Sequence, residues 1–256
     1  MTFGLKKYPK ASFKTKGESY MNYILSCCSC ADLSLEYVKR RDIHFINFHF
    51  MIDGTEYPDD MGQTISPEEL FKRMDAGADT KTSQISVMEY IEYFEEFLKQ
   101  GLDILHVTLS SGLSGTYNSA IIAADTLKEK YPDRKLYIVD SLGASSGYGL
   151  IVDTLADKRD EGMDIDSLYT WVMENRLCMH HWFFSTDLTY YIRGGRVSKP
   201  AGYVGKLLNI CPLLNMDHLG HLTPREKVRG EHHVANRTLE KMIAHADGGT
   251  SYSGKC

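Results

Sequence analysis

The chain has 256 residues, a formal net charge of −5 at pH 7 and a pI near 6.1. Hydrophobic residues make up 43% and charged residues 25% of the sequence, and the mean hydropathy is −0.31, which is typical of a soluble globular protein. The acidic balance argues against a nucleic-acid partner, because such partners usually need a basic face. No apolar run is long enough to cross a bilayer, so we expect no membrane span.

The N-terminal segment and the cysteines indicate the compartment. Residues 1–21 carry five lysines but lack the apolar stretch of a signal peptide, and we expect them to form a disordered leader outside the fold. Of the six cysteines, Cys27, Cys28 and Cys30 crowd into one segment and the others are scattered. No second ligand pair follows at zinc-site spacing, so buried small side chains explain these three better than a metal does. The sequence predicts a reducing, cytoplasmic location.

The first 160 residues are predicted to alternate between strands and helices. Compact apolar, aromatic or β-branched runs indicate the strands, and apolar residues at helical spacing, twice after a capping serine, indicate the helices. This alternation predicts a parallel sheet covered by helices. The predicted strands are 23–26, 43–52, 104–109 and 135–139, with a turn at Asp53-Gly54 into 55–57; the predicted helices are 33–38, a helix from 67, 87–98, 117–127 and 146–158, with a polar loop at 75–82.

The later part of the chain shows a different pattern. It predicts a strand, a short helix, a second helix, a hairpin and a last helix, at 178–185, 187–192, 203–208, 211–216 with 221–228, and 231–246. The predicted fold class is α/β, with an N-terminal parallel-sheet α/β/α domain and a second, mixed α+β domain. We expect these domains to span 22–175 and 176–256. We also expect the second domain to be truncated, because its last residues begin a strand that is not completed.

The segment after the strand at 104–109 is rich in hydroxyls and glycines. It reads Ser110-Ser111-Gly112-Leu113-Ser114-Gly115, and we call it the serine–glycine loop. The free N–H groups in the first turn of the following helix favour an anion, and hydroxyls can help them to hold a carboxylate or a phosphate. Capping of that helix by Ser114 or Thr116 explains the same residues about equally well.

Known catalytic motifs do not fit the serine–glycine loop. A serine-hydrolase elbow needs G-x-S-x-G, a Walker loop needs a lysine after its last glycine, and residues 112–116 supply neither. Gly147-Tyr148-Gly149 lacks the third glycine of a dinucleotide fingerprint, and adjacent histidines such as His180-His181 point apart. The sequence therefore predicts no catalytic residue, metal or cofactor. An enzyme or transferase that binds a small phosphorylated substrate at the loop stays open as the alternative.

Two further segments are candidate anion contacts. Thr82-Ser83-Gln84 precedes a capped helix, where turn formation or capping is the more ordinary role. Arg193-Gly194-Gly195-Arg196 places two guanidinium groups around a glycine turn, and such groups bind carboxylates or phosphates through paired hydrogen bonds. A flexible surface turn with solvated arginines explains this second segment equally well.

Several of these segments together resemble the DegV family. Their order and spacing agree with the family from about residue 22 to the end, and the serine–glycine motif and the glycine–arginine turn are its specific parts. The resemblance rests on Thr82-Ser83-Gln84 before a helix, the serine–glycine loop with Thr116-Tyr117, Asp140-Ser141 followed by Gly147, Arg193 to Ser198, Gly205 to Leu208 leading to Pro212, and Lys227 to Arg229.

The resemblance implies a bacterial lipid-binding protein that is not itself an enzyme. Such a protein holds one long-chain fatty acid, such as palmitate, stearate or oleate, in a buried tunnel. Some members present this acid to a separate fatty acid kinase, which forms the acyl phosphate used in phospholipid synthesis. The carboxylate would then be bound by Thr82, Ser110, Ser111 and Ser114, with Thr82 and Ser111 as direct donors. The head-group rim or kinase contact would be formed by Arg193 and Arg196.

The sequence departs from the family pattern in two places. The family's first strand ends in an aspartate–serine pair, whereas Cys28 precedes Ser29 here. The family also continues for several tens of residues, to a histidine- and glycine-rich loop near the head group, and this sequence ends at Cys256. We therefore expect either a fragment or an incomplete head-group site.

Overall fold

The computed structural model describes residues 22–197 and 209–246. Its first sheet is parallel, with the strand order β2-β1-β6-β7. The predicted α/β class and its parallel sheet are confirmed, while the predicted leader at 1–21 and helix at 203–208 lie outside the described residues. The strands are β1 at Tyr23–Cys28, β2 at Ile43–Ile46, β6 at Asp103–Thr108 and β7 at Leu136–Asp140.

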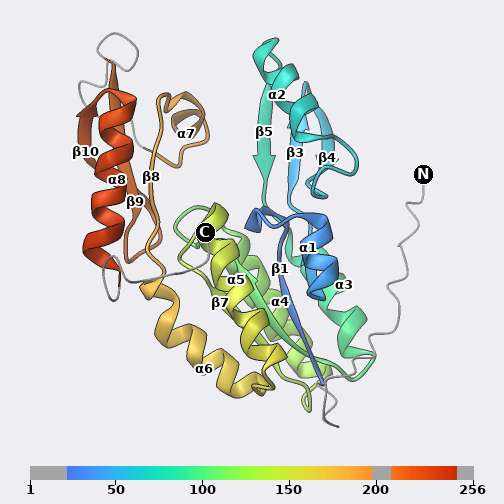
Figure 1. The fold of residues 1–256 in the computed structure, drawn as a ribbon. Helices are drawn as coiled ribbons and strands as arrows, with labels where there is room; N and C mark the ends of the chain where they lie inside the picture. The colour runs from blue at the N-terminus through green and yellow to red at the C-terminus, as the bar shows by residue number, and fades with distance from the viewer. Residues whose placement is uncertain (1–21, 198–208, 247–256) are drawn as a thin grey trace.

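Helices cover both faces of the parallel sheet (Figure 1). Helices α3 and α4 pack on one face, and α1, α5 and α6 pack on the other. Helix α3 begins at the predicted capping box, in which the Ser86 hydroxyl accepts the Glu89 N–H and the Glu89 carboxylate accepts the Ser86 N–H. Helix α6 was not predicted from the sequence. The bounds are Leu35–Arg40 for α1, Val87–Leu98 for α3, Thr116–Lys130 for α4, Ser145–Asp160 for α5 and Ile165–Asn175 for α6.

Strand β1 contributes to both cores because its side chains alternate between the two faces. Leu25 and Cys27 pack against the α5 side, and Ile24 and Cys28 pack against the α3 side. Cys27 and Cys28 are fully buried, which confirms their interpretation as small core side chains. Cys30 is only half-buried and lies in a 3-10 turn, η1, at Ser29–Ala31.

A second, antiparallel sheet interrupts the βα alternation. Its strand order is β4-β3-β5. In Figure 1 it lies above the parallel sheet, beside α2. The single strand predicted at 43–52 is therefore wrong, because β2 and β3 belong to different sheets. The Phe48 N–H donates to the Ser29 hydroxyl and the Phe48 carbonyl accepts the Asp59 N–H, which takes the chain out of the first ladder. The bounds are His49–Ile52 for β3, Thr55–Pro58 for β4, Pro67–Asp75 for α2 and Thr80–Ser83 for β5.

The later residues form a third, antiparallel sheet with the order β10-β9-β8. Helix α8 packs against it, and α7 lies on the side that faces α2 (Figure 1). The predicted hairpin is confirmed, but the strand predicted at 178–185 is shorter and follows a 3-10 turn, η2, at Arg176–Cys178. The bounds are Trp182–Phe184 for β8, Thr189–Arg193 for α7, Ile210–Met216 for β9, Leu222–Arg229 for β10 and Glu231–His245 for α8.

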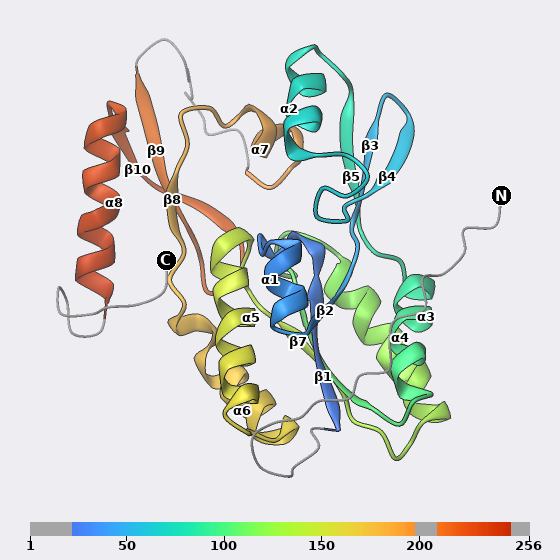
Figure 2. The same cartoon turned by 45° about the vertical axis from the view of Figure 1, so that its right-hand side comes forward.

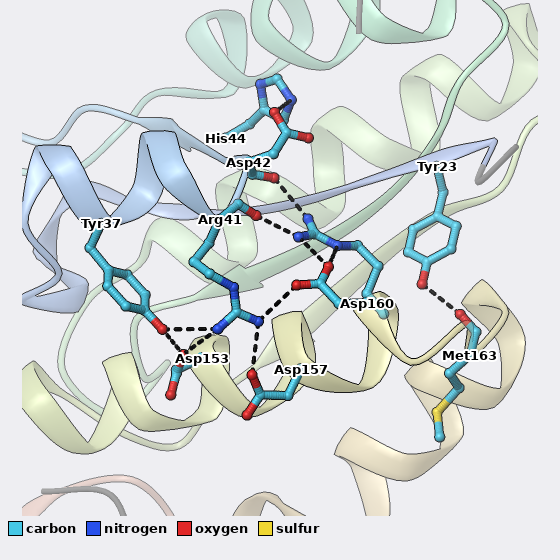
Figure 3. Close-up of polar contacts among 10 residues, drawn as sticks. Tyr23, Tyr37, Arg41, Asp42, His44, Asp153, Asp157, Asp160 and Met163 are labelled. Carbon is cyan, nitrogen blue, oxygen red and sulfur yellow. Dashed lines mark hydrogen bonds and ion pairs between the residues drawn. The ribbon is translucent and has the colours of Figure 1, made fainter. Parts of the chain in front are cut away.

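A polar cluster joins α1 to α5, and we call it the α1–α5 cluster (Figure 3). The Arg41 guanidinium donates to Asp157 at 2.8 Å, to Asp160 at 3.0 Å and to Asp153 at 3.3 Å. The Tyr37 hydroxyl donates to Asp153 and accepts from Arg41. One cation thus contacts three carboxylates that one helix presents within two turns.

A second arginine secures the end of α1. The Arg159 side chain donates through Nη1 to the Asp42 carbonyl at 2.8 Å and through Nη2 to the Arg41 carbonyl. These carbonyls follow the last turn of α1, where backbone acceptors lack helical partners. Arg159 also contacts Asp160, so Arg41 and Arg159 share one carboxylate.

Candidate functional site

The candidate site lies where the connections of the parallel sheet diverge. From β1 the chain continues to β2 on one side, whereas β6 and β7 lie on the other side. In open α/β sheets, ligands bind beyond the carboxyl ends of the strands at this switch point. The turn η1 leaves the sheet here after β1, and the serine–glycine loop leaves it after β6. The topology therefore puts the predicted loop at the expected position for a ligand.

Most backbone amides of the serine–glycine loop are already hydrogen-bonded. The Ser111 N–H donates to Asp140 Oδ1 at 3.0 Å, and the Gly112 N–H donates to Ser110 Oγ at 3.1 Å. The N–H groups of Leu113 and Ser114 both donate to the Ser110 carbonyl. The loop thus folds largely on itself and does not present a row of free amides.

Fewer backbone N–H groups are hydrogen-bonded at the start of α4 than in the serine–glycine loop. Its N-cap is Gly115, with no side-chain cap bond, and the Ser114 hydroxyl accepts the Thr116 N–H at 3.2 Å. Among the described residues, no partner accepts the N–H groups of Gly115, Tyr117 and Asn118. Free N–H groups at a helix start attract an anion. The local geometry therefore keeps the anion prediction open at α4, with Ser114 acting within the turn.

Ser110 joins the two halves of the described fold. Its side chain is fully buried, and its hydroxyl donates to the Gly220 carbonyl at 2.7 Å. Gly220 lies in the turn of the β9–β10 hairpin, which reaches the loops at the end of the parallel sheet (Figure 2). A methyl group on Gly112 would stand 2.5 Å from the same carbonyl oxygen. Glycine at this position lets the hairpin turn dock against the loop.

Ser111 has the opposite environment. Its side chain is exposed, and among the described residues its hydroxyl makes no hydrogen bond. Ser114 is half-buried, and its hydroxyl can still donate while it accepts the Thr116 N–H. Of the three predicted loop serines, Ser111 and Ser114 therefore keep a proton to offer, whereas Ser110 already donates its own.

Thr82 lies near the carboxyl-terminal end of β5, and Gln84, two residues later, contacts the serine–glycine loop. Thr82 is exposed and pairs with Phe50 across the ladder, so the predicted 75–82 loop is wrong at its end. Two residues later, the Gln84 side chain packs against Gly115 and donates to the Ser119 hydroxyl at 3.4 Å. Gln84 was not predicted as a site residue, because a single glutamine carries no spacing signal.

Arg193 and Arg196 are both exposed at the end of α7. The Arg193 guanidinium lies 5.7 Å from the centre of the Tyr190 ring, and Arg196 Nη1 donates to the Gly194 carbonyl at 2.5 Å. Neither arginine forms an ion pair within the described residues. Both therefore keep guanidinium donors directed to solvent.

A buried chain of neutral polar groups lies beneath the site. His106 is fully buried, and burial lowers its pKa to about 3, so its ring is neutral at physiological pH. Its Nδ1 lies 2.9 Å from the Ser26 hydroxyl. Cys28 Sγ lies 3.4 Å from the Tyr90 hydroxyl, which is 2.9 Å from the Thr116 hydroxyl at the start of α4. Burial raises the pKa of the Cys28 thiol, so the group at this position is uncharged, where the resemblance implied an aspartate.

Comparison with known proteins assigns the family. The DegV family model, described as an uncharacterised protein of the DegV family, matches residues 29–253. A DegV domain-containing protein of Clostridium perfringens is 39% identical over 208 residues, which cover 81% of this chain and 72% of that protein. The chain belongs to the DegV family. The resemblance drawn from the sequence motifs is therefore confirmed.

Solved DegV structures share the fold. A stearic-acid-binding protein from Eubacterium ventriosum is 28% identical, with a TM-score of 0.77 over 90% of this chain and 78% of that one. The Fatty Acid Kinase (Fak) B3 protein of Streptococcus pneumoniae, loaded with linoleic acid, has a TM-score of 0.74 over 88% of this chain and 79% of that one. At 23% identity, this second likeness shows the fold alone.

Two searches of the described residues concern other kinds of site. No helix in the described ranges is both long and apolar enough to cross a bilayer. The same ranges hold no group of three or more histidine, cysteine, aspartate or glutamate side chains arranged to bind a metal ion.

Proposed function

We propose that this protein binds one long-chain fatty acid as its ligand and presents the carboxylate to a separate fatty acid kinase. The observation that carries the proposal is the set of unused donors at the α4 start, on the Ser111 hydroxyl and the Gly115 N–H, at the switch point of the sheet. Family membership and the stearic-acid-binding neighbour support the choice of a fatty acid over other anions.

The energetics favour such a ligand at a site without a fixed counter-charge. Each acyl methylene that leaves water contributes about 0.8 kcal/mol, so a long tail supplies most of the affinity. The carboxylate needs only enough hydrogen bonds to offset its own desolvation. We propose Ser111 and Thr82 as its direct donors and Ser114 as a neighbour, and we assign Ser110 a structural part of the same site.

We propose that the C-terminal half supplies apolar contacts to the tail. Partly buried side chains pack there around a small buried cluster on the α7 side of the sheet, namely Phe183, Tyr191, Ile192 and Leu222 around Leu188, Val197 and Leu214. This arrangement supports a division into two domains near residue 175, because the parallel sheet and its helices end at Asn175 and β8 begins at Trp182. A cytoplasmic location fits this function and stays a prediction.

Extraction of the purified protein with organic solvent, followed by mass spectrometry, tests the ligand. We expect fatty acids of about 16 to 18 carbons in a folded sample. We also expect the melting temperature to rise on addition of palmitate or oleate, since a ligand that binds only the folded state stabilises it. No extracted fatty acid together with no shift would overturn the proposal. Stabilisation by phosphorylated sugars or nucleotides instead, if Ser111→Ala abolishes it, would favour the enzyme alternative at the serine–glycine loop.

The kinase part is tested separately, through Arg193 and Arg196. A double Arg193→Ala, Arg196→Ala variant is expected to retain fatty-acid binding, because both side chains point to solvent. We expect the same variant to lose at least about tenfold in acyl phosphate formation when a fatty acid kinase and ATP are added, which corresponds to the loss of charge-assisted contacts. Unchanged acyl phosphate formation would move the kinase contact elsewhere.

A further inference from the structure

A cavity of about 210 Å³ lies beside the candidate site, at the junction between the parallel sheet and the β9–β10 hairpin. Its walls come from the turn after β7, from η2 and the segment that follows it, and from the hairpin. Figure 2 shows this end of the hairpin beside β7 and α5. The lining residues are Leu142, Arg176, Leu177, Met179, His180, His181, Asn215, Met216, Asp217, His218 and Arg225.

Two arginines line the cavity, Arg176 from η2 and Arg225 from β10, and in the part of the chain that the structure describes neither pairs with a carboxylate. Arg176 Nη1 donates to the Asp140 carbonyl at 2.5 Å, and Arg225 Nε donates to the Asn215 side-chain oxygen at 2.7 Å. Neither forms an ion pair within the described residues. Each guanidinium is therefore held by one neutral acceptor, which orients it and leaves further N–H groups available.

Asp217 is the carboxylate that lines the cavity, and its oxygens are already engaged. Oδ1 accepts the N–H groups of Leu219 and His221, at 2.9 and 3.0 Å, and Oδ2 accepts the Thr223 hydroxyl at 3.1 Å. It thus shapes the hairpin turn and does not pair with either arginine. Two guanidinium groups against one carboxylate leave the cavity with a net positive charge.

The histidines of the cavity are placed differently from each other. His180 and His218 are exposed. His181 packs against the turn after β7 and the first turn of α5, where a methyl group on Gly143 would stand 2.7 Å from its ring and one on Gly147 would overlap it. Burial lowers the pKa of His181, so this ring is a neutral wall of the cavity.

We propose that this cavity binds a phosphate monoester of a small organic molecule. Arg176 and Arg225 would bind the phosphoryl dianion, because guanidinium forks match phosphate geometry and two of them balance its charge. Leu142, Met179 and Met216 would contact the organic group through their apolar side chains. This site is separate from the fatty-acid carboxylate at Ser111 and does not rest on the proposed lipid function.

Titration calorimetry of the whole protein with phenyl phosphate at pH 8 and constant ionic strength tests the site. At that pH the phosphate is a dianion. We expect saturable binding with a dissociation constant below about 1 mM, weakened at least about tenfold by Arg225→Gln, as for the loss of a hydrogen bond to a charged group. Arg229→Gln is the matched control, because it removes the same charge from the same exposed strand outside the cavity.

Three outcomes would overturn the proposal. The first is no saturable binding of phenyl phosphate up to about 20 mM, a concentration well above the expected dissociation constant of the site. The second is equal weakening by Arg225→Gln and Arg229→Gln, which would indicate a general charge effect. The third is competition between phenyl phosphate and oleate, which would place both ligands in the lipid site. Arg176→Lys tests the second arginine in the same titration with phenyl phosphate. The melting temperature of this variant reports whether the contact with the Asp140 carbonyl is kept.

Discussion

The α1–α5 cluster and the serine–glycine loop are both rich in polar groups, but they differ in how completely these groups are paired. In the cluster, Arg41 contacts three carboxylates and a tyrosine hydroxyl. In the loop, Ser110 is buried and donates across the fold, whereas Ser111, one residue later, is exposed with its hydroxyl unused. The comparison separates polar groups that hold elements together from polar groups that are available to a ligand.

The position of each region in the fold explains this difference. The α1–α5 cluster lies between two helices on one face of the sheet, where Arg41 and Asp153 are largely buried and need a partner within the protein. The serine–glycine loop lies beyond the carboxyl end of β6, where the turn leaves donors exposed. Substitutions in the two regions should therefore change different measured quantities.

Gly112→Ala should have the largest effect on stability. The added methyl group would meet the Gly220 carbonyl at 2.5 Å and the Leu219 carbonyl at 2.9 Å, both backbone atoms that cannot rotate away. We expect the free energy of unfolding to fall by about 3 kcal/mol, as for a severe case of overpacking. Urea unfolding measures this change. A loss below about 0.5 kcal/mol would mean that the hairpin turn does not need to stay docked on the loop.

Arg41→Ala should lower the free energy of unfolding by about 2 kcal/mol without changing ligand affinity. The variant leaves Asp153, which is largely buried, beside Asp157 and Asp160 without their shared cation. Carboxylates that lose this cation repel one another more strongly, although Arg159 still contacts Asp160 and the exposure of Asp157 and Asp160 reduces the penalty. Urea unfolding and fatty-acid titration of the same sample test both parts. A large loss of affinity would contradict a purely structural role for the α1–α5 cluster.

Acidification tests the buried chain beneath the loop. The folded pKa of His106 is lowered to about 3, whereas an unfolded histidine titrates near 6.5. Its contribution to stability is therefore present above about pH 6.5 and is lost as the pH falls towards 3, because the unfolded chain binds the proton first. From pH 7 to pH 5 we expect the free energy of unfolding to fall by about 2 kcal/mol through His106 alone, and urea unfolding at both pH values measures this change.

His106→Gln is the control for that experiment. Glutamine keeps a polar group near Ser26 but does not titrate, so the acid-induced loss should shrink by the same amount of about 2 kcal/mol. His44 and His181, whose pKa values are also lowered by burial, remain in both proteins and cancel in the difference. An unchanged loss of stability on acidification would show that His106 is not the responsible group.

Ser111→Ala should have the smallest effect on stability, and Ser110→Ala is its matched partner one residue earlier. Ser111→Ala should change stability by less than about 0.5 kcal/mol but weaken fatty-acid binding about tenfold, and more in combination with Thr82→Ala. Ser110→Ala should instead cost about 1 to 2 kcal/mol, because it leaves the buried Gly220 carbonyl without its donor. Fluorescent fatty-acid displacement and thermal unfolding compare the two. Equal affinities in all variants would place the carboxylate elsewhere.

Sequence signals that act over a few residues, such as caps and turns, predicted their elements correctly. The capping box at Ser86, the turn at Asp53-Gly54 and the hairpin around Gly220 were all predicted and are all present. The prediction failed at 43–52, where one apolar run is divided between two sheets, and it missed α6 entirely. The first case depends on a partner distant in sequence, because the Ser29 hydroxyl binds the Phe48 N–H. Helix α6 instead carries local signals that the prediction missed, namely an N-cap at Asp164 and buried residues at helical spacing.

The sequence by itself determined the family, the parallel sheet and the place of the serine–glycine loop after a buried strand, because motif order and hydrophobic periodicity are properties of the chain. Only the tertiary structure decided which loop serine is structural. Ser110 and Ser111 are alike as residues, but the hairpin turn at Gly220, 110 residues beyond Ser110, buries the first and leaves the second exposed. Burial and hydrogen bonding depend on such long-range contacts, so no local pattern could assign these two roles.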